Sequence, residues 1–282
     1  MTNWIKSMVL MTAMTLLFVW IGRMVGGQGG MVLALVFAAC LNFFSYWFSD
    51  KIVLKRYRAR EVTQMEQPEL YGIVQELSVA AGIPMPRLYI VPESSPNAFA
   101  TGRNPSHAAV AVTEGILQIL DRNELKGVLG HEMAHVVHRD ILIGTIAAVF
   151  SGAIMVLASI ARWGAIFGGF GGSNDDDGGI FGLLIAMFIA PLAAMIIQMA
   201  ISRSREYLAD SGGAKFSGNP LYLASALRKL DQFSRQVPLK RATPQTAHMF
   251  IVNPFSGRRI SSLFATHPAT GERIRRLEEM AR

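Results

Sequence analysis

The chain has 282 residues, of which 51% are hydrophobic, and its mean hydropathy of +0.32 indicates long apolar segments, which are uncommon in soluble proteins. The formal net charge of +7 could indicate a nucleic-acid-binding protein. No nucleic-acid-binding motif is present, however, and the basic residues cluster beside apolar segments, which favours anionic lipid head groups as their partners. The single cysteine, Cys40, excludes a disulfide framework and a zinc site built from cysteines.

Two apolar runs near the amino terminus predict a transmembrane hairpin within residues 1–50. The spans cover about 7–22 and 31–48, with a glycine-rich turn between them. The first run is short, which tilting or local thinning of the bilayer could accommodate. A cleaved signal peptide is the alternative for this run, although no A-x-A cleavage site follows it. By the positive-inside rule, the amino terminus and the segment after the second span are cytoplasmic, because that segment carries Lys51, Lys55, Arg56, Arg58 and Arg60.

Residues 51–140 have the composition of a globular domain. Pro68 begins a predicted helix that ends at Gly82. Residues 87–91 and 108–112 are expected to be strands, and 97–102, with small alternating side chains, is expected to be an edge strand or its approach. From the residues alone, sheet packing explains this last segment better than a functional role does.

The active-site motif predicted for this chain is His131-Glu132-Met133-Ala134-His135, which reads H-E-x-x-H. On a helix, residues four apart lie on one face, so His131 and His135 can share one metal ion. Glu132 lies beside them, placed to act as a general base rather than as a ligand. Asp121 and Glu124 form a capping box that predicts where this helix begins.

Two further apolar runs, about 141–161 and 180–201, predict a second transmembrane hairpin within residues 141–201. Their connection contains Asp175, Asp176 and Asp177 and only Arg162 as a basic residue, as expected outside the cytoplasm. The alternative is a helical hairpin buried inside the protein. Residues 202–282 form the second part of the globular domain.

The hairpin supplies a geometric argument for a third metal ligand. If the active-site helix continues into the third run, His135 lies about 9 Å from the start of that run, at 1.5 Å per residue. Glu206 lies about 7.5 Å beyond the end of the fourth run by the same rise, so the returning chain brings it to the histidine pair. Two histidines and a glutamate, with water in the fourth position, make a catalytic site. Asp210, one turn beyond Glu206, either orients a ligating histidine or makes an ordinary surface pair.

These motifs resemble those of the HtpX family of bacterial membrane metalloproteases, which are gluzincins similar to the CAAX prenyl proteases. The resemblance covers nearly the whole chain and rests on four motifs in the same order: H-E-x-x-H before a membrane hairpin, Ser204–Asp210, Asn97–Gly102, and Thr266–Pro268 with Glu272–Ile274. It implies an α+β, mostly helical, multi-pass membrane protein with a cytoplasmic gluzincin-like zinc protease domain.

The resemblance also implies roles for residues. His131, His135 and Glu206 would bind one Zn²⁺ per chain, Glu132 would be the general base, and Asn97 would begin the segment that lines the substrate cleft. His267 would lie near the scissile carbonyl. The implied activity is that of a zinc metalloendopeptidase in the bacterial inner membrane. Its substrates would be misfolded or damaged membrane proteins, cleaved in quality control and stress response.

A second function class stays open, a membrane scaffold or holdase that keeps zinc only for its structure. Glu132 favours the protease, because a structural zinc site does not need a base beside an open coordination position. Residues 242–259 carry no motif that assigns them a role.

Overall fold

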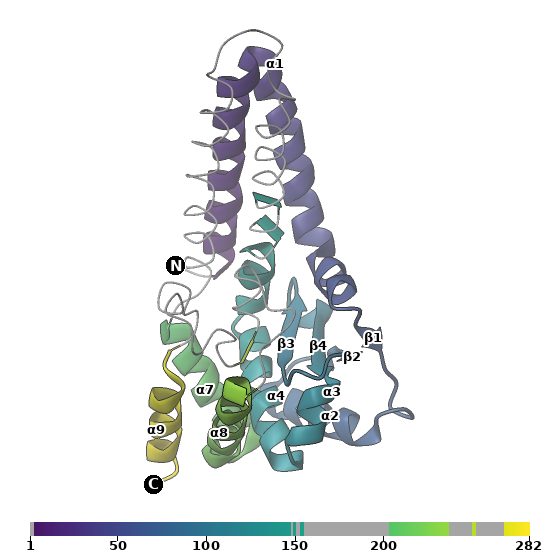
Figure 1. Ribbon diagram of the computed structural model, residues 1–282, viewed down its shortest axis with the longest axis vertical. Helices are drawn as coiled ribbons and strands as arrows, with labels where there is room; N and C mark the ends of the chain where they lie inside the picture. The colour runs from purple at the N-terminus through teal and green to yellow at the C-terminus, as the bar shows by residue number, and fades with distance from the viewer. Residues whose placement is uncertain (1–2, 148, 151–152, 155–202, 237–249, 252–267) are drawn as a thin grey trace.

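The structure is a computed structural model that describes residues 3–147, 149–150, 153–154, 203–236, 250–251 and 268–282. A long helical hairpin extends from a globular part that holds a small sheet and several helices (Figure 1). The described part is mostly helical, as expected.

The hairpin is α1 (Asn3–Arg56), two antiparallel helices joined by a bend at Gly26 and Gly27. Its two arms, Ile5–Arg23 and Gly26–Phe48, are long and apolar enough to cross a membrane, which agrees with the two expected N-terminal spans. The second arm begins earlier than expected, because only Gly26 and Gly27 leave the helical conformation. The arms also approach closely beside the bend: a Cβ atom on Gly30 would lie 2.2 Å from the carbonyl oxygen of Gly22.

The described residues form a sheet of four strands in the order β1-β2-β4-β3, which are β1 (Arg60–Glu61), β2 (Arg87–Val91), β4 (Ala108–Thr113) and β3 (Ala98–Gly102). β2 and β4 are parallel, and β3 pairs with β4 in the antiparallel direction. β3 therefore lies at an edge of the sheet, which confirms the edge-strand prediction.

Most helices of the globular part pack on a shared hydrophobic core. α2 (Pro68–Ala81) ends at Gly82 in the left-handed conformation, as predicted, and α3 (Glu114–Ile119) and η1 (Pro105–His107) are short. α4 (Arg122–Val137) begins with the predicted capping box of Asp121 and Glu124. The core packs α2, α4 and the sheet against α8 (Pro220–Gln236), and includes residues from α7 (Arg203–Ser217) and α9 (Thr270–Met280).

One premise of the geometric argument for Glu206 is wrong, because α4 does not continue into the third apolar run. α4 ends at Val137, and Arg139 has a φ angle of 57°, which an α-helix cannot contain. A new helix begins after this break and covers 140–147. Leu142, Ile143 and Ile146 of this helix pack against the apolar arms of α1. Most of the predicted second hairpin, residues 155–202, lies outside the described residues.

Candidate metal centre

Three side chains from two helices converge on one point. The Nε2 atoms of His131 and His135 are 3.2 Å apart, and oxygen atoms of Glu206 lie 3.7 Å and 3.8 Å from them, respectively. In a tetrahedral zinc site with bonds of about 2.1 Å, neighbouring ligand atoms are roughly 3.4 Å apart. The spacing of the three donors therefore fits a zinc ion, and the structure brings together the residues predicted as ligands.

Close packing of α4 and α7 brings Glu206 to the histidines. The backbones of the two helices touch at glycines: a Cβ atom on Gly213 would lie 2.6 Å from the His131 amide nitrogen, and one on Gly130 would lie 2.8 Å from the Gly213 carbonyl oxygen. Side chains at these positions would push the helices apart. Glu206, in the first turn of α7, thus reaches the face of α4 that carries the histidine pair.

A buried carboxylate and a buried arginine support His131. Asp210 is buried and places an oxygen 2.9 Å from Nδ1 of His131, a position from which it could orient this imidazole and which an ordinary surface pair would not have. Arg273, with a relative exposure of 1%, donates to both oxygens of Asp210, at 2.9 Å and 2.7 Å. Burial raises the pKa of Asp210, but the charge of Arg273 and the hydrogen bonds from His131 and Arg273 outweigh it and hold that pKa well below its usual range.

His135 has a similar support. Its Nδ1 atom lies 3.3 Å from Asp140, and the other oxygen of Asp140 lies 3.5 Å from Arg205. Burial lowers the pKa of His135, but the hydrogen bond to Asp140 and the charges of Glu206 and Glu132 raise it to about 9. The surroundings of this imidazole thus favour a positive charge.

The chemistry of the donor set fits a metal cation. With both Nδ1–H groups directed at carboxylates, the Nε2 lone pairs of His131 and His135 and the carboxylate of Glu206 face one another. Three acceptors at this spacing repel one another unless a cation lies between them. Histidine nitrogens and a carboxylate are ligands that zinc prefers.

The remaining predicted site residues have different surroundings. Glu132 is buried, and its Oε2 accepts a hydrogen bond of 2.9 Å from the backbone N–H of Ala100 on β3. Asn97, which immediately precedes β3, is also buried, and its Oδ1 accepts from the Ile251 amide at 3.2 Å. His267 lies outside the described residues.

Sequence reasoning assigned no role to Asp140 or Arg273. A signal existed for Arg273, because it shares a helical face with the apolar Leu277 in α9, and an arginine on an apolar face needs a buried partner. Asp140, immediately before an apolar run, carried no comparable signal.

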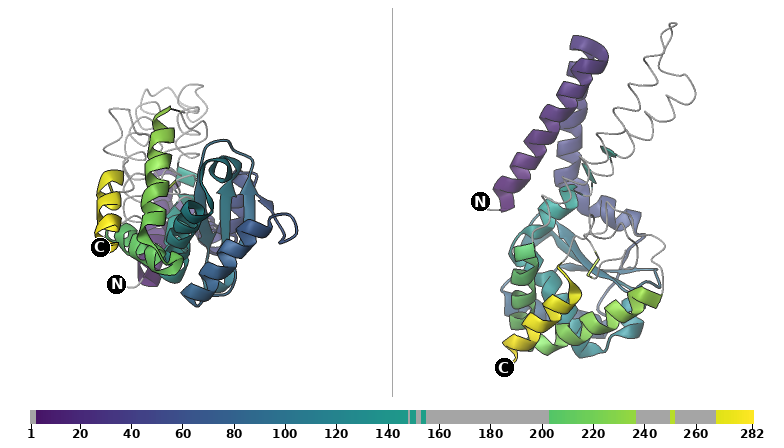
Figure 2. Two further views of the ribbon diagram at one scale, coloured as in Figure 1. Left: turned by 90° about the horizontal axis from the view of Figure 1, so that it is seen from below. Right: turned by 60° about the vertical axis from the view of Figure 1, so that its left-hand side comes forward.

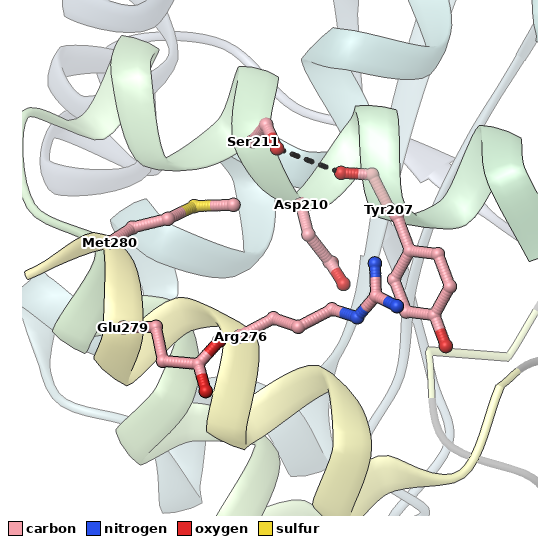
Figure 3. Close-up of a pocket in the computed structure, with 6 residues that line it drawn as sticks. All are labelled: Tyr207, Asp210, Ser211, Arg276, Glu279 and Met280. Carbon is pink, nitrogen blue, oxygen red and sulfur yellow. Dashed lines mark hydrogen bonds between the residues drawn. The ribbon is translucent and has the colours of Figure 1, made fainter.

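Behind Asp210, a cavity of about 270 Å³ lies between α7 and α9. Figure 3 shows Arg276 of α9 pointing towards Tyr207 of α7, and its guanidinium carbon lies 3.8 Å from the centre of that ring. This contact holds α9 on α7 next to the Asp210–Arg273 pair. The second view in Figure 2 shows α9 against the globular part, on the side away from the tip of the hairpin.

Known proteins are similar in sequence to this chain over nearly its whole length. The sequence profile of peptidase family M48 matches residues 64–281. The chain is 59% identical over 278 residues to a protein named Protease HtpX homolog from Syntrophotalea carbinolica, covering 99% of both chains. It is 57% identical over 279 residues to the protein of the same name from Pyrococcus furiosus, covering 99% of this chain and 96% of the other.

Among solved structures, the crystal structure of Ste24p from S. mikatae is similar, with a TM-score of 0.56 at 20% identity. The match covers 98% of this chain but only 65% of that one. At this identity the likeness concerns the fold alone.

Proposed function

Since the chain belongs to peptidase family M48, with relatives named as HtpX proteases along its full length, we propose that this membrane-associated metallopeptidase is a zinc-dependent endopeptidase of the bacterial inner membrane. Its substrates are misfolded or damaged membrane proteins, cleaved in quality control and stress response. The observation that carries the proposal is the convergence of His131, His135 and Glu206 on one point, with Glu132 adjacent to His131 in the chain.

The proposed mechanism uses a few side chains in fixed roles. Bound to these three residues, zinc would lower the pKa of a water ligand and polarise the peptide carbonyl. Glu132 takes the proton from the attacking water and later passes it to the leaving amine. Asp210 and Asp140 accept from the Nδ1 atoms of the two imidazoles, which leaves the Nε2 atoms as the nitrogens that would hold a metal.

The edge of β3 that no other described strand covers is the proposed binding place for the substrate. The Thr113 amide donates to the Asn97 carbonyl, so in an antiparallel ladder the backbone groups of 97, 99 and 101 face β4 and those of 98, 100 and 102 face outwards. The N–H group of Ala100 meets Glu132 on this outer side. An extended peptide added along the edge would therefore pass beside the general base, and Asn97 lies immediately before this strand.

Substitution of Glu132 tests the proposal directly. Glu132→Gln should keep zinc, because the residue is not a ligand and Gln can still accept the Ala100 hydrogen bond. Casein degradation in detergent should fall to background, as it should for the wild type treated with a chelator. If the variant loses zinc together with activity, Glu132 is not the base. If the wild type binds zinc and cleaves nothing, the scaffold or holdase function gains support.

His267 is proposed to stabilise the negative charge on the carbonyl oxygen in the transition state, because His131, His135 and Glu206 already supply three ligands and the fourth position is needed for water. Loss of one such donor lowers turnover by roughly a hundred- to a thousandfold. His267→Ala should therefore retain zinc and substrate affinity and lose turnover by that factor. A near wild-type rate would exclude the role, and loss of zinc would make His267 a ligand instead.

A further inference from the structure

A second cavity, of about 670 Å³, lies where the second candidate span of α1 ends. Its walls come from the end of that arm, from the start of β2 and from the β3–β4 connection. These three segments lie close together at the junction of hairpin and sheet (Figure 1). The cavity is separate from the candidate metal centre, because it shares no lining residue with it.

The wall on α1 is aromatic and exposed. Phe43 and Trp47 are 56% and 44% exposed, respectively, and Phe48 is the last residue of the candidate span. Exposed Trp and Tyr side chains at the end of a span are characteristic of the head-group level of a bilayer. Lys51, which also lines the cavity, follows Phe48 by three residues, about 4.5 Å along the helix.

The wall opposite α1, from the start of β2 and the β3–β4 connection, carries basic side chains. The guanidinium of Arg103 stacks over Trp47 at 4.7 Å from the ring centre, and Arg87 donates to Asp50 at 3.0 Å. Among the described residues that line the cavity, three are basic, Lys51, Arg87 and Arg103, and one is acidic, Asp50, which leaves an excess of positive charge there. Within the described part of the chain, neither Lys51 nor Arg103 has a carboxylate partner.

We propose that this cavity binds the head group of an anionic phospholipid. Lys51 and Arg103 contact the phosphate, and the acyl chains lie along Phe43 and the apolar face of α1 above it. The charge selects an anion, and the exposed aromatic wall at the end of a span selects a lipid rather than a free phosphate. The inference rests on the proposed insertion of α1 in a bilayer and not on proteolysis.

The site also has a structural consequence for the sheet. Arg103 follows β3 directly, because that strand ends at Gly102, and Arg87 begins β2. A lipid held between these residues and α1 would fix the β3 edge relative to the membrane surface. The lipid would thereby set the height at which a substrate strand could join the sheet.

The test uses the purified full chain in detergent, with lipid binding measured by native mass spectrometry and by thermal unfolding. The added probes are dioctanoyl phosphatidylglycerol, dioctanoyl phosphatidylcholine and inorganic phosphate. We expect binding and stabilisation by phosphatidylglycerol alone. Lys51→Gln and Arg103→Gln should each weaken its binding by about fivefold, because each removes one basic residue from an anionic lipid.

Lys55→Gln is the matched control, because Lys55 is an exposed lysine one turn further along α1 that does not line the cavity. It should leave lipid binding unchanged. An equal loss in Lys51→Gln and Lys55→Gln would overturn the proposal in favour of diffuse attraction, and equal binding of phosphatidylcholine or phosphate would overturn it as well. Zinc content and casein cleavage are measured separately, so failure of the protease proposal leaves the lipid result readable.

Discussion

At the scale of single residues, Arg273 holds Asp210, and Asp210 in turn contacts His131. Arg273 is fully buried, it donates to both oxygens of Asp210, and it also donates to the carbonyl oxygen of Ile251 at 2.9 Å. Buried charges of opposite sign stabilise each other only as a pair, so loss of one partner leaves the other with its full desolvation cost. The metal centre therefore depends on an arginine that does not bind the metal.

Arg273→Ala should lower the free energy of unfolding by about 3–5 kcal/mol, because it leaves the Asp210 carboxylate buried without a counter-charge. Zinc affinity should fall by roughly ten- to a hundredfold, since Asp210 would no longer orient His131. Thermal unfolding in detergent and zinc competition with a chelator measure the two effects. Arg275→Ala, at an exposed position of the same helix where the guanidinium pairs with Glu272 and Glu279, is the control and should change zinc affinity by less than about twofold. Similar losses in both variants would contradict a specific role for Arg273.

The residues that could be predicted are those within local patterns. The spacing of His131 and His135 indicates a shared ligand face without knowledge of the fold, because helix geometry alone sets it. Arg273 meets Asp210 only through the packing of α9 on α7, and a sequence does not show which distant helices touch. Asp140 could not be assigned for a related reason: its position depends on the break at Arg139.

At the scale of elements, the contact between α4 and α7 determines the geometry of the metal centre. It depends on Gly130 and Gly213, which allow the backbones to touch beside His131. The predicted outcome, that Glu206 reaches the histidine pair, is confirmed in the structure, although the continuous helix assumed for it is absent. Packing of two glycine-bearing faces, rather than the length of the hairpin, accounts for the position of Glu206.

Gly213→Ala should separate these helices, because the added methyl group would lie 2.6 Å from the His131 amide nitrogen. Overpacking of this kind costs about 1–3 kcal/mol, and the shift of Glu206 should lower zinc affinity by at least about tenfold. Zinc binding and thermal unfolding would be measured together. Gly72→Ala in α2, where no heavy atom lies within 4 Å of the new Cβ, should be neutral or stabilising. Wild-type zinc affinity in Gly213→Ala would show that the glycine contact does not position Glu206.

At the scale of the whole molecule, we propose four segments: a transmembrane hairpin in 1–50, two parts of one cytoplasmic protease domain in 51–140 and 202–282, and a second transmembrane hairpin in 141–201. The two described arms of α1 and the packing of 140–147 against them support the proposal. The contact between α4 and α7 supports the union of the two domain parts.

Cysteine labelling in intact cells tests this topology, in a variant with Cys40 replaced by serine. A reporter cysteine at Asn174, in the acidic connection, should react with a membrane-impermeant reagent from outside. A reporter at Lys55 should react only after permeabilisation, because the positive-inside rule places it in the cytoplasm. A reporter at Asn174 that is protected until permeabilisation would favour the buried helical hairpin.

Because Arg273 belongs to the last helix of the chain, the support of His131 also depends on the order in which the chain is synthesised. The ribosome makes His131 142 positions before Arg273, so every nascent chain passes through a stage in which the H-E-x-x-H motif exists without its arginine. At that stage Asp210 has no counter-charge, and we expect the centre to stay incomplete. Arg273 can pair with Asp210 only after α9 has left the ribosome, so the last helix of the chain completes the support of His131.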